Sequence, residues 1–294
     1  MSSSSALMIA CFFAIAHSNA LYGRPQYSAN IQNHEDLAAY LATIENGQSF
    51  RALQGDKGVG TFGGSEDHIA ILTCEPTRLR QYSFCPVQFQ RSIPLPPGYT
   101  FAIASSGVPA EKTGPAMAKY NRASSLARAA VEKWNSATHR ADPHLAAAIQ
   151  SSPDAPDRLR AILADAPDLL NRFEQFHAES NQIIPAAADA LLRGDIASLS
   201  PLVDRSQHLA ETLLGNQVPE TIHLAQSARR LGSPAASAFG AGFGGSVWAL
   251  METQSAASFL SAWQSDYRAA FPDHASASTF FLTRPGPAAA RLFA

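Results

Sequence analysis

The residues with the clearest chemical potential are four consecutive serines, Ser2 to Ser5, directly before an apolar run that extends to Ala16. The run predicts a buried helix over residues 4–20, because it is too long for a strand and nearly apolar all round. The first turn of a helix has backbone N–H groups without intrahelical acceptors, and with serine hydroxyls beside them these groups bind anions. The stretch therefore predicts a phosphate-binding helix N-terminus.

The same stretch has a second interpretation. A short apolar run followed by Ser18-Asn19-Ala20 is also typical of a signal peptide cleaved after Ala20, although residues 2–16 contain no Lys or Arg for a positive n-region. A transmembrane helix is not expected, because the run is shorter than the roughly 20 apolar residues that a bilayer requires.

A second candidate for phosphate binding is the glycine-rich stretch at residues 239–246, where Gly240, Gly242 and Gly245 satisfy the pattern Gly-x-Gly-x-x-Gly. A dinucleotide-binding loop of this pattern leads into a helix, whereas residues 246–250 predict a strand. The stretch favours a tight glycine turn between two core strands, or a loop whose glycines allow phosphate to approach the backbone.

Two carboxylates could serve a phosphate site. Asp67 follows the pair Gly63-Gly64, where a short helix over 67–72 is expected to begin, so Asp67 is either an N-cap or a general base. Glu45 ends a predicted helix over 33–45 with apolar residues at three- and four-residue spacing. A lone Glu at a helix end is usually solvated, but Mg²⁺ beside phosphate needs a carboxylate or hydroxyl ligand. No histidine spacing is typical of a transition-metal site.

Length and composition restrict the classes of function. A chain of 294 residues can form one large domain or two smaller ones, and a formal net charge of -2 gives no general attraction to nucleic acid. The three cysteines, Cys11, Cys74 and Cys85, form no Cys-x-x-Cys pair and indicate buried or partly buried free thiols. We expect a cytoplasmic protein that binds neither nucleic acid nor a membrane.

The elements that must position these residues are both helical and extended. Residues 55–67 predict a glycine-rich loop with close backbone approaches, and Pro94, Pro96, Pro97 and Gly98 break the chain. Strands are expected within 78–92, over 99–105, within 235–252 on both sides of the glycine turn, and over 279–282. Helices are expected over 114–137, in several pieces from 142 to 230, and over 254–270. This order predicts an α+β fold with helices grouped in the middle.

Together these motifs resemble the GHMP kinases, and the galactokinase branch most closely. The similar stretches span essentially the whole chain in the family's order, and they are the serine run, Ile44-Glu45-Asn46, residues 64–68, Tyr120-Asn121-Arg122, residues 240–245 and the ending 285–291. The resemblance implies a two-domain α+β fold. A ribosomal protein S5-like N-terminal domain, here truncated, would cover residues 1–98, and a ferredoxin-like C-terminal domain with extra helices would cover 99–294.

The resemblance also implies roles for individual residues. Ser2, Ser3 and Ser4 resemble the hydroxyls of the family's phosphate loop, and Ser4 and Glu45 resemble its Mg²⁺ ligands. Asp67 resembles the aspartate that receives or orients the proton of the attacking sugar hydroxyl.

Further positions would contact the two substrates. Gly64 and Tyr120 resemble positions at the sugar. The loop that closes on the phosphates of ATP is matched by Gly240, Gly242, Gly244 and Gly245. The cofactors implied are ATP and Mg²⁺, and the substrate is a monosaccharide, with galactose at its anomeric hydroxyl the first candidate.

Alternatives remain within this resemblance. The protein could phosphorylate another sugar, such as arabinose or glucuronate, or could bind sugar or nucleotide without catalysis. The family's N-terminal segment, which carries its sugar-recognition signature, has no counterpart in the sequence, and Met1 stands where relatives commonly have Leu. We therefore expect the intact kinase to have additional residues before Met1, and this chain alone to be poorly soluble or inactive. We expect the kinase to be a monomer.

Overall fold

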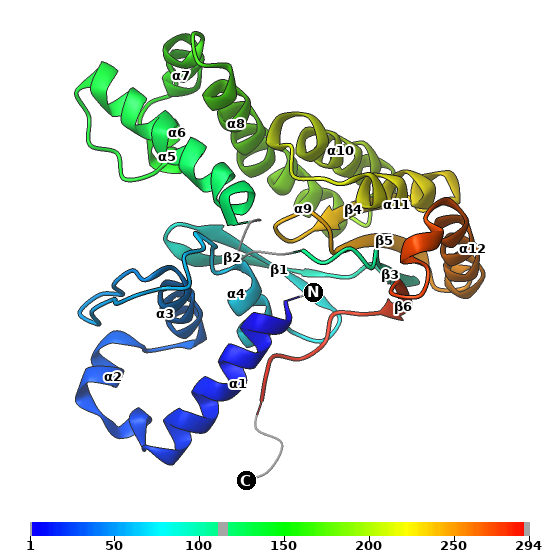
Figure 1. The fold of residues 1–294 in the computed structure, drawn as a ribbon, viewed down its shortest axis with the longest axis horizontal. Coiled ribbons are helices and arrows are strands. Elements are labelled where there is room, and N and C mark those ends of the chain that lie inside the picture. Colours follow the sequence, from blue (N-terminus) through cyan, green and yellow to red (C-terminus); the bar gives the residue numbers. More distant parts are fainter. Residues whose placement is uncertain (1, 111–116, 291–294) are drawn as a thin grey trace. The chain divides into compact units, whose positions relative to one another are not determined.

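The computed structural model describes residues 2–110 and 117–290, so Met1 and Arg291 of the sequence comparison lie outside the described residues. The chain divides into two compact units of mixed helix and strand (Figure 1). Unit 1 comprises Met1–Pro94, Lys112–Met117 and Arg284–Ala294, and unit 2 comprises Leu95–Glu111 and Ala118–Thr283. The α+β class predicted from the sequence is confirmed.

Unit 1 joins a group of helices to an antiparallel hairpin. Its described elements are α1 (Ser3–Ser18), the 3-10 turn η1 (Leu21–Gly23), α2 (Pro25–Asn30), α3 (His34–Asn46), α4 (Glu66–Thr73), β1 (Arg78–Phe84) and β2 (Val87–Pro94). The apolar faces of α1, α3 and α4 meet in one core, to which Ile9, Leu41 and Leu72 contribute buried side chains. This core fixes the relative positions of the helices that carry the predicted serines and carboxylates of unit 1.

Helix α1 is not the buried helix that its composition predicted. Only Ser5, Ile9 and Ala16 are buried, whereas Leu7 and Ile15 are 66% and 57% exposed. The prediction was wrong because an apolar composition shows how much of a helix could be buried, not how many of its sides have neighbours. In the described chain one stripe of α1 packs into the core.

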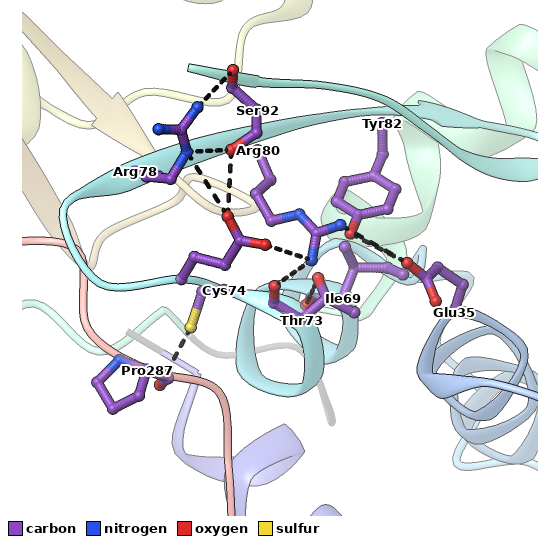
Figure 2. A network of polar contacts seen from close by, with 10 residues as sticks. Glu35, Ile69, Thr73, Cys74, Arg78, Arg80, Tyr82, Ser92 and Pro287 are labelled. Carbon is purple, nitrogen blue, oxygen red and sulfur yellow. Dashed lines mark hydrogen bonds and ion pairs between the residues drawn. The ribbon is translucent and has the colours of Figure 1, made fainter. Parts of the chain in front are cut away.

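A polar network holds the C-terminal end of α4 against the hairpin (Figure 2). Arg80 of β1 donates through Nη1 to the Thr73 carbonyl oxygen over 2.6 Å, and its guanidinium lies 3.9 Å from Glu35 and 3.7 Å from Glu75. Its Cζ also lies 4.4 Å from the centre of the Phe89 ring. Because the last carbonyls of a helix have no intrahelical donor, Arg80 supplies one and ties α4 to β1.

Residues 285–289, near the end of the described chain, reinforce the same helix end. The Ala289 N–H donates to the Ile71 carbonyl oxygen over 2.8 Å, and the Thr77 N–H donates to the Pro285 carbonyl oxygen over 2.9 Å. The Cys74 thiol lies 3.3 Å from the Pro287 carbonyl oxygen (Figure 2). Contacts from β1 and from residues 287–289 therefore fix one end of α4, while the other end carries Asp67.

Among the described residues, unit 2 has one antiparallel sheet in the order β4-β5-β3-β6. Its strands are β3 (Tyr99–Ser105), β4 (Ala235–Phe239), β5 (Ser246–Glu252) and β6 (Thr279–Thr283). In chain order the strands lie 2-3-1-4, and helices occupy the first and third connections, as in a ferredoxin-like fold. The strands predicted around the glycine turn and over 99–105 are confirmed.

Helices pack on both faces of this sheet. On one face Ala102 and Val247 lie in a core with Trp263 of α12 (Ala256–Ala270), and on the other Leu250 lies in a core with Leu199. The remaining helical elements of this unit are α5 (Met117–Thr138), α6 (Leu145–Gln150), α7 (Ala155–Leu163), α8 (Pro167–Ala178), η3 (Glu179–Ile183), α9 (Ile184–Leu192), α10 (Ile196–Leu209), η4 (Ala210–Leu214), α11 (Pro219–Arg230) and η5 (Pro272–His274). The grouping of helices between 142 and 230 is confirmed.

The structure also tests the membrane and cysteine predictions. Within residues 2–110 and 117–290, no helix has the length and apolarity needed to span a bilayer. All three cysteines are free, but Cys11 and Cys85 are exposed and only Cys74 is half-buried. The expectation of buried thiols was wrong for the first two, because Cys11 lies on the exposed side of α1 and Cys85 lies in the hairpin turn.

The Arg80 network gives a prediction about stability. Replacing Arg80 by Met leaves the Thr73 carbonyl without this donor and Glu35 and Glu75 without this cation, so unfolding free energy should fall by about 1–3 kcal/mol. The matched change Arg78→Met on the same strand removes a side chain that is 40% exposed, and should cost less than about 1 kcal/mol. Urea unfolding monitored by circular dichroism measures both, and equal losses would contradict the role given to Arg80.

Candidate active site

The end of α3 lies beside the start of α4, and each of these helix ends carries one predicted site residue. Glu45 is in the last turn of α3 and Asp67 is in the first turn of α4. The Glu45 Oε1 atom lies 3.7 Å from Nε2 of His68, the residue directly after Asp67. The structure thus brings Glu45 to the same helix end as Asp67.

The local backbone explains this approach. Gly47 ends α3 in the left-handed region at φ 75°, and the chain then folds back so that the Val59 N–H donates to the Glu45 carbonyl oxygen over 2.8 Å. A Cβ on Gly58 would lie 2.4 Å from that carbonyl oxygen, so only glycine allows the contact. The Asn46 side chain then donates to the Gly63 carbonyl oxygen over 3.4 Å. The predicted glycine-rich loop with close backbone approaches is confirmed.

The position of Asp67 tests one of its two interpretations, the N-cap. Ser65 is the N-cap of α4 and is buried, so Asp67 lies two residues inside the helix and the N-cap interpretation is wrong. Its side chain is half-buried. A carboxylate here is favoured by the helix dipole. Its role toward a hydroxyl stays a prediction.

The serines lie at a helix start that has no side-chain capping bond. Ser2 is the N-cap of α1, but its hydroxyl donates to the Ser5 hydroxyl over 2.8 Å and makes no capping bond. The first turn contains no acidic residue, and Ser3 and Ser4 are exposed. The first-turn N–H groups therefore have neither a side-chain cap nor a competing carboxylate, which is the arrangement that favours a phosphate oxygen.

The predicted metal ligands are of the types that Mg²⁺ uses when it binds together with a phosphorylated ligand. Within the described chain, no group of three or more His, Cys, Asp or Glu side chains could hold a metal by itself. Mg²⁺ usually keeps several waters and binds through one or two carboxylates plus substrate phosphates. The half-buried Glu45 carboxylate and the exposed Ser4 hydroxyl are ligands of that kind, so both predicted positions remain compatible with Mg²⁺.

The glycine loop between β4 and β5 has a strained backbone that its sequence permits. Left-handed φ values occur at Gly240 (81°), Gly242 (84°), Gly244 (132°) and Gly245 (85°), and also at Phe243 (59°). A side chain costs about 1–2 kcal/mol at such angles. Glycine is therefore needed here for conformation, as the sequence indicated.

Asn216 clamps this loop. The Phe243 N–H donates to the Asn216 carbonyl oxygen over 2.6 Å, and the Asn216 side-chain amide donates to the Ala241 carbonyl oxygen over 3.1 Å. A Cβ on Gly242 would lie 2.1 Å from the Asn216 carbonyl oxygen. The sequence did not predict a role for Asn216, since no motif links it to a loop 25 residues later. The only signal is its place directly after Gly215, which ends a helical segment.

The far end of the loop is held by the segment after β3. Ser106 donates to the Gly245 carbonyl oxygen through both its N–H and its hydroxyl, each over 2.8 Å, and the Gly245 N–H donates to the Val108 carbonyl oxygen over 2.9 Å. The Tyr267 hydroxyl donates to the Ser106 carbonyl oxygen over 2.6 Å. Burial raises the pKa of Tyr267 to about 12, so this donor keeps its proton at neutral pH.

The two remaining predicted positions are Tyr120 and Gly64, which were expected at the sugar. Tyr120 lies in the first turn of α5 and is half-buried, and it belongs to unit 2 with the glycine loop. Gly64 lies against the Phe84 ring, where a Cβ would come within 2.4 Å of the ring edge. Ser2, Ser3, Ser4, Glu45, Gly64 and Asp67 all belong to unit 1.

Comparisons with known proteins were made for the sequence and for the fold. Residues 187–269 match the family model described as GHMP kinases C terminal, a range that includes Asn216 and the glycine loop. No curated protein matches the sequence. The structure resembles Lactococcus lactis galactokinase, solved in complex with galactose, with a TM-score of 0.68 and 20% identity over 87% of this chain.

This chain covers 61% of that galactokinase chain, and at 20% identity the likeness shows the fold alone. Two weaker likenesses are to L. major mevalonate kinase, solved with R-mevalonate (TM-score 0.36, 17% identity, 72% of this chain and 49% of that chain), and to a homoserine kinase from Cytophaga hutchinsonii (TM-score 0.34, 13% identity, 69% and 47%).

The glycine loop gives a prediction with an internal control. Both Gly242→Ala and Gly240→Ala add a Cβ at positive φ, which costs about 1–2 kcal/mol of stability. Only Gly242→Ala drives that Cβ into Asn216, whereas Gly240 has nothing within 4 Å. Overpacking should add a further 1–3 kcal/mol or so for Gly242→Ala. Urea unfolding compares the two variants, and indistinguishable losses would contradict the clamp.

Proposed function

Because the chain carries a GHMP kinase C-terminal domain on a galactokinase-like fold, we propose that it is an ATP-dependent sugar kinase. The reaction transfers the γ-phosphoryl group of ATP to the anomeric hydroxyl of a monosaccharide. The observation that supports this most strongly is the approach of Glu45, at the end of α3, to His68, the residue directly after Asp67 in the first turn of α4. Both helices share a core with α1, whose N-cap makes no side-chain capping bond.

Phosphoryl transfer suits such a site. The sugar oxygen attacks the γ-phosphorus, the bond from that phosphorus to the β,γ-bridging oxygen breaks, and ADP leaves. The transferred group carries dispersed negative charge, so catalysis depends chiefly on positioning and charge stabilisation. Mg²⁺, held by Ser4 and Glu45, would supply positive charge beside the phosphates.

The protein's own residues would act in three ways. The first-turn N–H groups of α1, with Ser2 and Ser3, bind phosphate oxygens. Gly240, Gly242, Gly244 and Gly245 have no side chains, which allows close approach of phosphate to their backbone. Asp67 accepts the proton of the attacking hydroxyl or holds that hydroxyl in line, a contribution of roughly 10²–10⁴ in rate.

Galactose is the first candidate for the sugar. Lactococcus lactis galactokinase was solved with galactose bound, and this chain resembles its fold at a TM-score of 0.68. Gly64 and Tyr120 are proposed to contact the sugar. Arabinose and glucuronate are the next candidates, and we further propose that the kinase is a cytoplasmic monomer.

The test is turnover on a sugar panel. The polypeptide as the cell makes it is incubated with ATP, Mg²⁺ and galactose, arabinose, glucose or glucuronate. ADP release is followed by a coupled assay, and ³¹P NMR identifies the product. We expect a sugar 1-phosphate with galactose. Binding of galactose and nucleotide without ADP release would instead identify a non-catalytic binding protein, and binding of neither would refute the proposal.

Asp67 provides the sharpest mutational prediction. Asp67→Asn should lower kcat by about 10²–10⁴ and leave ATP affinity nearly unchanged, because the carboxylate acts on the sugar hydroxyl. The matched control is Glu66→Gln, which neutralises the exposed acid beside it in the same helical turn. Steady-state kinetics should show near-normal turnover for the control. Wild-type turnover by Asp67→Asn would remove Asp67 from the mechanism.

A further inference from the structure

We propose that His68 is a positioning residue that fixes the Glu45 carboxylate for Mg²⁺. The inference rests on the proposed function, since it assigns the role of a neighbour to a metal ligand named there. Neither the motif resemblance nor the helical pattern gives His68 this task.

The imidazole lies behind the site rather than in it. His68 is 1% exposed, and it lies in α4 between Asp67 and the core residue Ile69. Successive residues of a helix point about 100° apart, because a helix has 3.6 residues per turn. Asp67 is half-buried beside the fully buried His68. In the same helical turn, Asp67 is therefore accessible to a substrate, whereas His68 contacts only the protein interior.

Glu45 is held on two sides. Its backbone is fixed by the Val59 N–H, 2.8 Å from its carbonyl oxygen, and its carboxylate oxygen Oε1 lies 3.7 Å from Nε2 of His68. The Glu45 side chain is 21% exposed, so one side of the carboxylate faces protein and the other can face solvent or a metal. A carboxylate with one oxygen close to a buried imidazole has fewer rotamers to lose when the second oxygen binds Mg²⁺.

The type of residue matters at this position. A carboxylate that is four-fifths buried needs a polar neighbour, because an apolar side chain would leave it desolvated without compensation. Neighbours that orient a ligating side chain commonly change metal affinity by about 10–100-fold when they are replaced. His68 also joins the two helices that carry Glu45 and Asp67, so it couples metal binding to the position of the proposed base.

The experiment compares two amides that mimic different imidazole atoms. The amide nitrogen of His68→Gln reaches the position of Nε2, whereas that of His68→Asn reaches only the position of Nδ1. Ile69→Val, a mild change at the adjacent buried residue, is the control for packing. The Mg²⁺ dependence of ADP binding is measured by calorimetry, with melting temperature recorded for every variant, so the readout does not depend on turnover.

We expect His68→Asn to raise the Mg²⁺ concentration for half-maximal ADP binding by about tenfold or more, and His68→Gln and Ile69→Val to stay within about threefold of wild type. Equal Mg²⁺ dependence in the Asn and Gln variants would overturn the proposal. In a Glu45→Gln background, His68→Asn should add no further loss, because the group that it positions is gone. An additional loss there would also overturn it.

Mg²⁺-dependent ADP binding by the wild-type protein distinguishes a failure of the His68 proposal from a failure of the proposed kinase function. No Mg²⁺-dependent ADP binding by the wild type contradicts the proposed kinase itself. Wild-type binding that is Mg²⁺-dependent, with His68→Asn indistinguishable from wild type, contradicts only the role of His68.

Discussion

The arrangement of unit 1 depends on the fold-back of a glycine-rich loop onto the end of α3. At Gly47 and Gly58 the backbones come so close that no side chain fits between them. This contact ends α3 at a defined residue, delivers the chain to the start of α4 and places Glu45 beside His68. The position of Glu45 is thus a consequence of backbone packing, because Gly47 and Gly58 allow the loop to fold back onto the end of α3.

In unit 2 a glycine loop is likewise held by close backbone contacts, here with Asn216. Gly242 can be only glycine because Asn216 occupies the space of a Cβ, and Ser106 and Tyr267 hold the other end of the loop by hydrogen bonds. A backbone that is clamped at both ends keeps its conformation when a charged ligand arrives, so little ordering free energy is lost on binding. Rigid loops of this kind suit a reaction in which positioning supplies most of the rate.

The features that depend on local pattern could be predicted from the sequence. Turn chemistry, periodicity and motif order predicted the glycine-rich loops and the strands on each side of residues 240–245. The exposure of α1 could not be predicted, because its apolar run does not reveal which sides have neighbours. Asn216 and His68 were missed as supports since their roles arise from tertiary contacts between distant segments, and hydropathy carries no record of such contacts.

The central claim is that adjoining helix ends hold a Mg²⁺ ligand and a proton acceptor for one transfer reaction. A crystal structure of the natural polypeptide with Mg²⁺, a non-hydrolysable ATP analogue and galactose tests this most directly. We expect a Glu45 carboxylate oxygen on the metal, His68 against the other oxygen, and Asp67 within hydrogen-bond distance of the anomeric hydroxyl. A metal bound without Glu45, or a sugar hydroxyl out of reach of Asp67, would contradict the claim.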